Sequence, residues 1–436
     1  MKLSVVGLGR LGLPFSFFLA SKGNKVFAYD KDLSIKKKVK KKNNIEPKLN
    51  TYIRKYKNKV FIENGINNLI NKSDTTFIVL PTPSIKNGSF SNSYILKSLD
   101  QIAVALKSKK KKNHSIVITS TVSPGSCDEF VKYMNNKGLI NNVDFSFIYN
   151  PHFIAQGTTL HNLEKPDLIL IGTDNEFTKN KINSFYNKIY KRKNLLKNTN
   201  FKEGEISKIA INCYITTKIS FSNYISEISE SVKNIDAKKI LDVIGQDKRI
   251  NHSYMKVGTK FSGPCFPRDN FALINYSKKI KVNPFIPIAT NIINSKQSIR
   301  IIKILKKIIS KNKKRLSIGL FGLTYKTDTN LIEGSQGDSL LKEISKNKLN
   351  IKNINIYDNF LKAKDVYFYN KKLNFFKNKI SFLKKSKIII LMYQTPENKI
   401  LQNYSTRNDK YILDCWRTDI ELNKKLKLIQ FGKSFD

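Results

Sequence analysis

Short apolar runs alternate with glycines and polar stretches at the start of the chain. Lys2–Val6 and Lys25–Tyr29 are apolar runs of strand length, and Leu13–Lys22 between them has helical character and ends at Gly23. Apolar runs bounded by turn residues predict strands, and the segment between them predicts a helix. The start of the chain therefore predicts a β-α-β unit.

The same alternation continues along the first half of the chain. Lys-rich helical segments separate further apolar runs that predict strands at Thr75–Leu80, Ser115–Thr119, Phe145–Tyr149 and Leu168–Ile171. Strands that alternate with helices favour a parallel sheet covered on both faces. We expect this first domain to span residues 1–195.

A long helix is predicted next. The stretch Glu203–Lys233 has no proline, and its only glycine lies close to its start. Apolar and small residues recur along it at helical spacing: Ile206, Ile209, Cys213, Thr217, Phe221, Tyr224, Ile228 and Val232. A helix of this length between two domains is typical of a spine or an oligomer interface.

The rest of the chain returns to the α/β pattern. A Gly/Pro-rich segment at Lys256–Pro267 precedes a helical region that reaches about Ile309, and Phe271 and Tyr276 are expected in the core. Strands are then predicted at Leu316–Phe321, Ile354–Tyr357, Ile388–Met392 and Tyr411–Leu413. The predicted fold class is α/β, with two Rossmann-like parallel-sheet domains joined by a long central helix. The expected domains are 1–195, 196–310 and 311–436.

Charge adds a question about partners. Among 436 residues, 79 Lys and Arg face 33 Asp and Glu, a formal net charge of +46 that favours anionic partners such as nucleic acid, acidic lipids or phosphorylated small molecules. The lysines are spread through loops and polar helix faces, and no basic ladder interleaved with aromatic residues indicates nucleic-acid binding. We expect no specific nucleic-acid partner, and we interpret Lys107–Lys112 as a solvated helix end.

The cysteines bear on compartment and metal binding. Cys127, Cys213, Cys265 and Cys415 lie far apart, with no C-x-x-C pair and no histidine at zinc-ligand spacing. We therefore expect no bound metal and a reducing compartment. Glycines interrupt the apolar N-terminus before a signal-peptide core forms, and no apolar run approaches the roughly 20 residues that span a bilayer. These patterns predict a cytoplasmic protein without membrane insertion.

A glycine-rich turn carries the first chemical signal. Gly7-Leu8-Gly9-Arg10-Leu11-Gly12 connects the first strand to the first helix. In such a fingerprint the first glycine allows a tight turn, the second lets the backbone approach a pyrophosphate, and the third lets helix and strand pack closely. Asp30 ends the next strand, where a carboxylate accepts hydrogen bonds from an adenosine ribose and repels a 2′-phosphate. The pattern predicts NAD as the cofactor.

A second signal surrounds one cysteine. The segment from Phe261 to Asp269 reads F-S-G-P-C-F-P-R-D. Its glycine and prolines restrict the backbone, and Arg268 and Asp269 place charge beside Cys265, a setting that favours a reactive thiolate. We interpret Cys265 as a nucleophile and the other cysteines as small buried residues.

Two polar residues on the long helix are candidates of a weaker kind. Lys208 and Asn212 lie one turn apart and so share a face. The residues alone leave open whether they stabilise an oxyanion and position a water or form a solvated face.

Further motifs follow one another in order. They are Leu80–Pro83 (LPTP), Ser120–Gly125 (STVSPG), Asn150-Pro151 with Phe153, Pro166-Asp167 with Ile171-Gly172, Lys208–Asn212 (KIAIN), Arg249-Ile250, the Cys265 segment, Gly322–Lys326 (GLTYK) with Asp328-Thr329, and Tyr357-Asp358. Through these motifs, over nearly its whole length, the chain resembles the nucleotide-sugar dehydrogenases, the UDP-glucose/GDP-mannose dehydrogenase family.

The resemblance implies NAD-dependent oxidation of the C6 alcohol of a UDP-sugar to the uronate, with UDP-glucose as the leading candidate and two NAD reduced in turn. Cys265 would capture the aldehyde as a thiohemiacetal and then hold a thioester. Lys208 would stabilise the developing oxyanion. Asn212 and Asp269 would hold a water and the sugar, and Thr121 would help to position that water.

The resemblance also implies binding residues. Those for NAD are Gly7, Gly9, Leu11, Gly12, Asp30, Pro81, Thr82 and Thr121. Those for the UDP-sugar are Asn150, His152, Phe153, Lys208, Asn212, Arg249, Phe261, Lys326 and Arg417. Arg249 would reach the site of a neighbouring subunit, and Lys326 and Arg417 would offer cations to the sugar and its diphosphate.

The resemblance assigns a role to each expected domain. Residues 1–195 would bind NAD, residues 196–310 would dimerise and carry the catalytic cysteine loop, and residues 311–436 would bind the UDP-sugar. A homodimer through the Glu203–Lys233 helix follows from the same reading.

The sequence departs from the family pattern where water would be activated. His152 and Gln156 stand where members commonly carry glutamates for thioester hydrolysis, although a neutral histidine could act as a base near pH 7. Other departures are Glu333 for a common Arg, Arg268 for a common Lys, and Ser262 within a common glycine pair. Two alternatives stay open: a protein that binds NAD and a nucleotide sugar but fails at hydrolysis, and a dehydrogenase for a UDP-N-acetylhexosamine.

Overall fold

The computed structural model describes residues 2–32, 34–35, 37, 39, 46–108, 113–154, 157–192, 194–327, 329–406, 409–418 and 421–434. The chain divides into two compact units. The first contains Met1–Ile211 and Asn275–Lys281, and the second contains Asn212–Ile274 and Val282–Asp436. The expected borders at residues 195 and 310 stay predictions.

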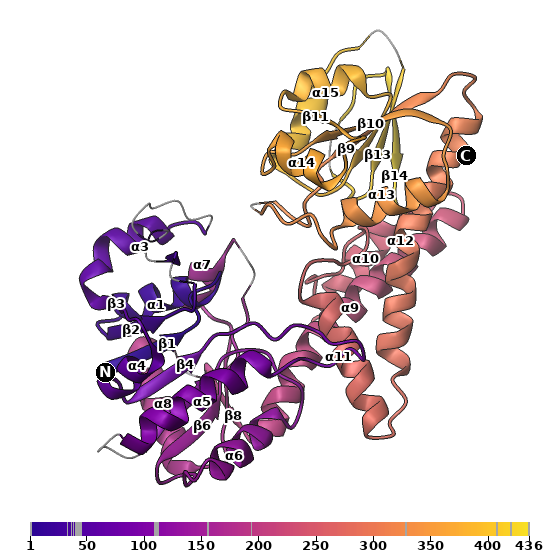
Figure 1. Cartoon of the computed structure of the whole chain (residues 1–436). Helices are drawn as coiled ribbons and strands as arrows, with labels where there is room; N and C mark the ends of the chain where they lie inside the picture. The colour runs from indigo at the N-terminus through magenta and orange to yellow at the C-terminus, as the bar shows by residue number, and fades with distance from the viewer. Residues whose placement is uncertain are drawn as a thin grey trace. The chain divides into compact units, whose positions relative to one another are not determined.

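The first unit is built on an eight-stranded sheet with the order β3-β2-β1-β4-β5-β6-β7-β8 (Figure 1). Its strands are β1 (Lys2–Val6), β2 (Lys25–Tyr29), β3 (Val60–Ile62), β4 (Thr75–Ile78), β5 (His114–Ile118), β6 (Phe145–Tyr149), β7 (Ile169–Gly172) and β8 (Leu196–Thr199). All neighbours are parallel except β6 and β7, which pair antiparallel. The strands expected from the apolar runs are confirmed to within about two residues at each end.

Helices cover both faces of this sheet. They are α1 (Gly12–Ser21), α3 (Leu49–Tyr56), η1 (Lys57–Lys59), α4 (Ile66–Lys72), α5 (Ser93–Ser108), α6 (Ser126–Asn136), α7 (Thr159–Glu164) and α8 (Glu176–Ile189). One core joins the sheet to α1, α3, α7 and α8, and the other joins it to α4, α5 and α6. Since α1 buries nearly every residue, it fixes the turn that precedes it against the sheet.

The predicted long helix is α9 (Phe201–Ser231), which is 31 residues long. It passes from the first unit into the second, because the border between the units falls at Ile211 and Asn212. Helix α11 (Phe266–Lys279) also crosses the border. Phe271 on α11 is 53% exposed, so its expected place in the core is wrong. The inward face of α11 carries Asp269, Asn270 and Ala272 instead.

The second unit contains a six-stranded parallel sheet with the order β11-β10-β9-β12-β13-β14. Its strands are β9 (Leu316–Phe321), β10 (Ile351–Tyr357), β11 (Asn374–Phe376), β12 (Ile388–Leu391), β13 (Lys410–Asp414) and β14 (Leu426–Gln430). Its further helices are α10 (Ala237–Gln246), α12 (Phe285–Ser310), α13 (Gln336–Lys346), α14 (Ala363–Tyr369), α15 (Lys379–Lys385) and η2 (Pro396–Leu401). The two sheets and the long helix confirm the predicted fold class.

Parallel strands place their carboxyl ends along one edge of each sheet, which is where ligands bind in such folds. The glycine turn, Asp30, Pro81 and Thr121 follow the ends of β1, β2, β4 and β5 in the first unit. Within the described residues, no helix is long and apolar enough to cross a membrane.

Candidate functional site

The glycine turn after β1 has the geometry that the fingerprint requires. Gly7 has a φ of +95°, and its N–H donates to the Tyr29 carbonyl at 2.8 Å. A Cβ on Gly7 would lie 2.3 Å from the Val79 carbonyl oxygen, and one on Gly12 would lie 1.8 Å from the Gly7 oxygen. A Cβ on Gly9 would meet nothing within 4 Å. Gly7 and Gly12 are therefore required by the fold, and Gly9 leaves open space for a ligand.

Asp30 is tied to this turn by its carboxylate. Oδ2 accepts the Leu8 N–H at 2.6 Å, and Oδ1 accepts the Asp32 N–H at 2.8 Å. The side chain is half-buried, and each carboxylate oxygen has a second lone pair. The backbone thus orients Asp30 while leaving it able to accept ribose hydroxyls, so these residues fit an NAD adenosine.

The loops after β4 and β5 are joined beside this turn. Thr82 donates its hydroxyl to the Thr121 carbonyl at 2.6 Å. Ser120 accepts the Leu80 N–H at 2.9 Å and donates to the Leu80 carbonyl at 2.6 Å. Because β4 and β5 are neighbours, these contacts fix two of the loops to which cofactor residues are assigned.

Glu205 on α9 holds the loop of Thr121 and was not found from the sequence. Its carboxylate accepts the N–H groups of Gly125 at 2.5 Å and Cys127 at 2.8 Å. The side chain is fully buried, and this burial raises the pKa of Glu205. It caps the N-terminus of α6, where a carboxylate is favourable. Its partners are distant in the chain, so no local pattern reveals the contact.

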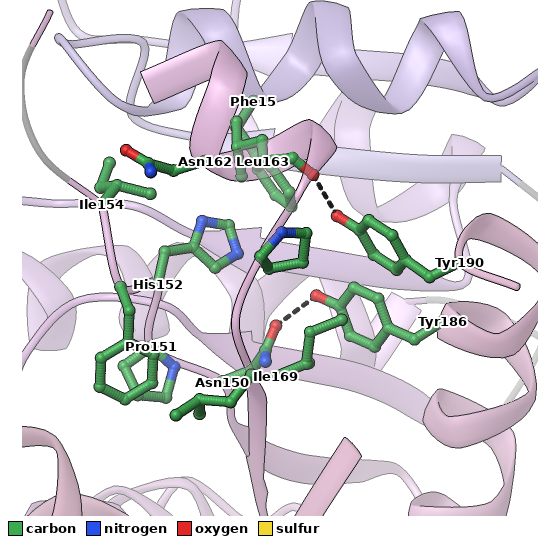
Figure 2. Close-up of a pocket in the computed structure, with 13 residues that line it drawn as sticks. Phe15, Asn150, Pro151, His152, Ile154, Asn162, Leu163, Ile169, Tyr186 and Tyr190 are labelled. Carbon is green, nitrogen blue, oxygen red and sulfur yellow. Dashed lines mark hydrogen bonds between the residues drawn. The ribbon is translucent and has the colours of Figure 1, made fainter. Parts of the chain in front are cut away.

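The segment after β6 contains the residues assigned to the substrate in this unit. Asn150 is buried, donates its amide to the Leu170 carbonyl at 2.8 Å and accepts a hydrogen bond from the Tyr186 hydroxyl (Figure 2). Both ends of the amide are therefore engaged inside the protein. The structure gives Asn150 a positioning contact, and its contact with substrate stays a prediction.

His152 points into a cavity of about 30 Å³ in the first unit (Figure 2). Its ring packs edge-on against Phe15, with centroids 4.5 Å apart, and its Nδ1 is enclosed without a hydrogen-bond partner. Burial, and then the charge of Lys208, lower the pKa of His152 to about 3. The imidazole is therefore neutral at pH 7, as a base requires, but it holds a proton only weakly.

Lys208 lies against the same segment. Its ammonium donates to the His152 carbonyl at 2.8 Å and lies 4.3 Å from the centre of the Phe153 ring. Lys208 is 8% exposed. The structure thus brings together three of the predicted substrate residues, and it places the cation of Lys208 at the end of β6.

In the second unit, Cys265 occupies the start of a helix. It is exposed, and the Asp269 N–H donates to its carbonyl at 2.9 Å as α11 begins. Free N–H groups at a helix N-terminus stabilise negative charge nearby. Gly263 has a φ of +85°, and a Cβ there would lie 2.8 Å from the Tyr325 ring. The loop that presents the thiol therefore packs on the GLTYK motif and requires glycine at 263.

Asn212 and Asp269, to which the resemblance assigns one role, form a hydrogen-bonded pair. The Asn212 amide donates to Asp269 Oδ2 at 2.6 Å, and Arg268 Nε donates to Oδ1 at 3.2 Å. Asp269 is 1% exposed, while Cys213, one residue along α9, donates to its carbonyl at 3.5 Å. A buried carboxylate needs such partners. They hold Asp269 in place on α11, one helical turn after Cys265.

Two amides that the sequence did not reveal hold the chain before Cys265. Asn294 on α12 accepts the Phe261 N–H at 2.7 Å and donates to its carbonyl at 3.1 Å. Asn223 on α9 donates to the Thr259 carbonyl at 2.9 Å. Because both amides bind main-chain atoms, they fix the backbone irrespective of the side chains there.

The remaining predicted substrate residues of the second unit are Arg417, Arg249 and Lys326. Arg417 forms two hydrogen bonds with Asp236, at 2.6 and 2.7 Å, and this pairing lowers the pKa of Asp236 to about 2. Arg249 is exposed and pairs with Asp247 at 2.6 Å. The Lys326 ammonium lies 5.9 Å from the centre of the Tyr325 ring. Both arginines have carboxylate partners, so their contacts with substrate stay predictions.

Some expectations fall outside what the structure describes. Gln156, Asp328 and residues 109–112 of the basic run lie outside the described residues. Among the described residues, no group of three or more His, Cys, Asp or Glu side chains is arranged to hold a metal ion.

These features define a dinucleotide-binding α/β protein with an exposed thiol on its second unit. Residues 1–190 match the NAD-binding domain of the UDP-glucose/GDP-mannose dehydrogenase family, and residues 202–296 match the central domain of the same family. The chain belongs to the UDP-glucose/GDP-mannose dehydrogenase family. This confirms the resemblance and NAD as the cofactor.

Individual relatives agree with this assignment. The UDP-glucose 6-dehydrogenase of Rickettsia bellii (strain RML369-C) is 27% identical over 350 residues, which cover 79% of this chain and 78% of that protein. The UDP-glucose 6-dehydrogenase TuaD of Bacillus subtilis (strain 168) is 29% identical over 336 residues, or 76% of this chain and 70% of that protein.

Solved structures share the fold. A UDP-glucose dehydrogenase from Pyrobaculum islandicum has a TM-score of 0.86 at 23% identity, covering 100% of this chain and 98% of that one. A UDP-D-ManNAc dehydrogenase from Pyrococcus horikoshii has a TM-score of 0.83 at 20% identity, covering 99% of both chains.

The low pKa of His152 makes stability depend on pH. The folded value near 3 lies below the ordinary value of 6.5, so the unfolded chain binds this proton first as pH falls. The contribution of His152 to the free energy of unfolding is complete above about pH 6.5 and is lost as the pH falls towards 3. About 1.4 kcal/mol of it is lost at pH 5.5. Between pH 7.5 and 5.5, we expect the free energy of unfolding of His152→Gln to fall by about 1.4 kcal/mol less than that of wild type. Thermal unfolding at the two pH values measures both.

The control for this experiment is His252→Gln, because His252 is exposed. It should keep the pH dependence of the wild-type protein. Equal losses of stability in wild type and His152→Gln would contradict a buried neutral imidazole at position 152.

Proposed function

We propose that this protein oxidises the C6 alcohol of a UDP-sugar to the uronate, with UDP-glucose as the leading candidate. The observation that carries the proposal is the exposed Cys265 at the start of α11, together with the buried Asp269 and its half-buried partner Asn212. The curated relatives named above, which act on UDP-glucose by their names, support the same reaction.

Cys265 accounts for the second half of the oxidation. Its thiolate adds to the aldehyde carbon, and the carbonyl oxygen takes a proton, which gives a thiohemiacetal. Loss of hydride from that carbon and of the proton from its oxygen leaves a thioester on sulfur. Water then adds to the thioester carbon, the carbon–sulfur bond breaks, and the products are the carboxylate and the free thiol. Bound NAD supplies the hydride acceptor for each of the two oxidations.

Residues around the thiol support these steps. Asn212 and Asp269 offer an amide and a carboxylate, which can hold a water or a sugar hydroxyl. The family motifs support Lys208 as the oxyanion partner and Thr121 as a water ligand. Within the first unit, the His152 carbonyl holds the ammonium of Lys208 on α9, and the Thr82 hydroxyl holds the Thr121 carbonyl. Lys326 and Arg417 remain the proposed cations for the sugar nucleotide.

His152 supports one alternative. A histidine with a pKa near 3 is a weak base at neutral pH. If no other group activates water, oxidation would stop at the thioester, and the protein would bind its ligands without turnover. The preferred sugar is also open, since UDP-D-ManNAc dehydrogenase shares the fold. A cytoplasmic location stays a prediction.

Replacing the thiol tests the reaction. We expect Cys265→Ser to lower uronate formation by about 10³-fold or more, because the serine hydroxyl is a far weaker nucleophile. NAD binding should be unchanged. The measurement is uronate released from UDP-glucose with excess NAD.

A labelling experiment supplies the control. Cys127, Cys213 and Cys415 are buried, whereas Cys265 is exposed, so brief treatment with iodoacetamide should label wild type and leave Cys265→Ser unlabelled. Labelled wild type should lose uronate formation as the variant does. Undiminished uronate production by Cys265→Ser would refute the mechanism.

We propose in addition that the protein is a homodimer through α9. Within the second unit the helix carries an apolar stripe whose members are between 40% and 68% exposed, namely Tyr214, Phe221, Tyr224, Ile228 and the adjoining Val232. Ile209 and Cys213, by contrast, are buried against their own units. Large apolar side chains at this spacing on one helix favour a protein partner, and a second copy of the chain offers the matching surface.

A charge placed in the stripe tests the dimer. We expect Phe221→Glu with Tyr224→Glu to convert a dimer to a monomer, because the interface would bury two unpaired carboxylates. Ser381→Glu, at an exposed polar position of α15 and so outside the stripe, should leave the dimer intact. Light scattering after size-exclusion chromatography gives the mass. A double variant that keeps the dimeric mass would exclude this interface.

A further inference from the structure

The second unit repeats the turn that binds NAD in the first. Gly322 follows β9 as Gly7 follows β1, with a φ of +106° against +95°. The Gly322 N–H donates to the Tyr357 carbonyl at 2.8 Å, and the Gly7 N–H donates to the Tyr29 carbonyl at 2.8 Å. The two turns make the same contact, because in each one the glycine N–H donates a hydrogen bond to the last residue of the neighbouring strand.

The acidic residue is repeated as well. Asp358 follows β10 as Asp30 follows β2, and its Oδ2 accepts the Leu323 N–H at 2.8 Å, where that of Asp30 accepts the Leu8 N–H at 2.6 Å. Oδ1 of Asp358 accepts the N–H of the second residue after it at 2.8 Å, as Oδ1 of Asp30 does at 2.8 Å. Asp358 therefore stands where a dinucleotide fold places its ribose-binding carboxylate.

The third loop matches too. The Val79 N–H donates to the Val6 carbonyl at 2.8 Å, and the Met392 N–H donates to the Phe321 carbonyl at 3.1 Å. Leu80 and Tyr393 are the next residues, so they occupy equivalent positions. After one intervening residue, each is followed by a Thr-Pro pair, at 82–83 and 395–396.

The two units differ in what surrounds the carboxylate. In the second unit the Tyr393 hydroxyl donates to Asp358 Oδ2 at 2.9 Å. The Thr324 hydroxyl lies 3.1 Å from the same atom and 3.0 Å from the Lys326 carbonyl, so its one proton is shared between these two acceptors. Thr324 stands at the position of Gly9. A Cβ on Gly322 would lie 2.6 Å from the Tyr393 ring, so the ring covers the turn. Asp358 is 4% exposed, whereas Asp30 is half-buried.

The space that remains is too small for a sugar. A cavity of about 10 Å³ lies at the ends of β9 and β10, lined in part by Asp358, Tyr393 and Glu397. Such a volume holds about one water molecule. The Tyr393 ring fills the position above the turn.

We propose that the hydroxyls of Tyr393 and Thr324 take the place of the two ribose hydroxyls on Asp358. The second unit thus retains a nucleoside-binding frame that its own side chains close, and the Tyr393 ring is what keeps a ribose away from Asp358. The UDP-sugar assigned to this unit would be held by other residues, Lys326 and Arg417. The ligand class that the frame fits is a nucleoside with a free cis-diol. This inference does not depend on the UDP-sugar reaction.

Exchanging residues between the units tests the proposal. Tyr393→Leu with Thr324→Gly gives the second unit the residues of the first, Leu80 and Gly9. The full chain is saturated with NADH and with UDP, so that both proposed nucleotide sites are filled, and is then titrated with adenosine by calorimetry. We expect wild type to bind no adenosine and the double variant to bind one equivalent per chain. With 2′,3′-dideoxyadenosine the affinity should fall at least about tenfold, because the diol is lost.

Controls separate this result from misfolding and from other sites. Unchanged NADH affinity shows that the first unit is intact, and Tyr393→Leu alone serves if the double variant does not fold. Tyr393→Phe keeps the ring and should stay closed to adenosine. Adding Asp358→Asn to the open variant should abolish the new binding. An equivalent of adenosine bound by wild type, or none bound by a folded open variant, would overturn the proposal.

Discussion

The polar side chains on the covered faces of α9 are the constraint on which the functional loops depend. Glu205 binds the loop before α6, Lys208 binds the end of β6, Asn212 binds Asp269, and Asn223 binds the chain before Cys265. Each contact joins residues far apart in sequence, and most end on backbone atoms. Losing one partner of a buried contact of this kind costs about 1–3 kcal/mol, so α9 stabilises the loops that it binds.

The sequence predicts the parts of the fold whose causes are local. Apolar runs mark the central strands, because those strands are buried on both faces. The edge strands β3 and β8 were not predicted, since β3 has only three residues and β8 carries polar residues such as Lys197 and Asn198. Phe271 shows the same limit, because periodicity alone does not say which face of α11 is covered.

The candidate site divides in the same way. The glycine turn, Asp30 and the Cys265 segment are contiguous patterns with a known mechanism, and the structure gives each the expected geometry. Glu205, Asn223 and Asn294 were missed, since each acts on main-chain atoms of a distant segment. His152 is intermediate: the sequence shows the departure from the family pattern, and only the structure shows that burial and Lys208 keep its ring neutral.

The central claim is that Cys265 carries one UDP-sugar through two oxidations and a hydrolysis. The most direct measurement is the amount of NADH formed per UDP-glucose consumed by the purified protein, together with the free uronate. The account predicts two NADH per sugar and one uronate, with turnover continuing after the first cycle. A single burst that leaves the sugar attached to Cys265, or one NADH per sugar with release of the aldehyde, would contradict it.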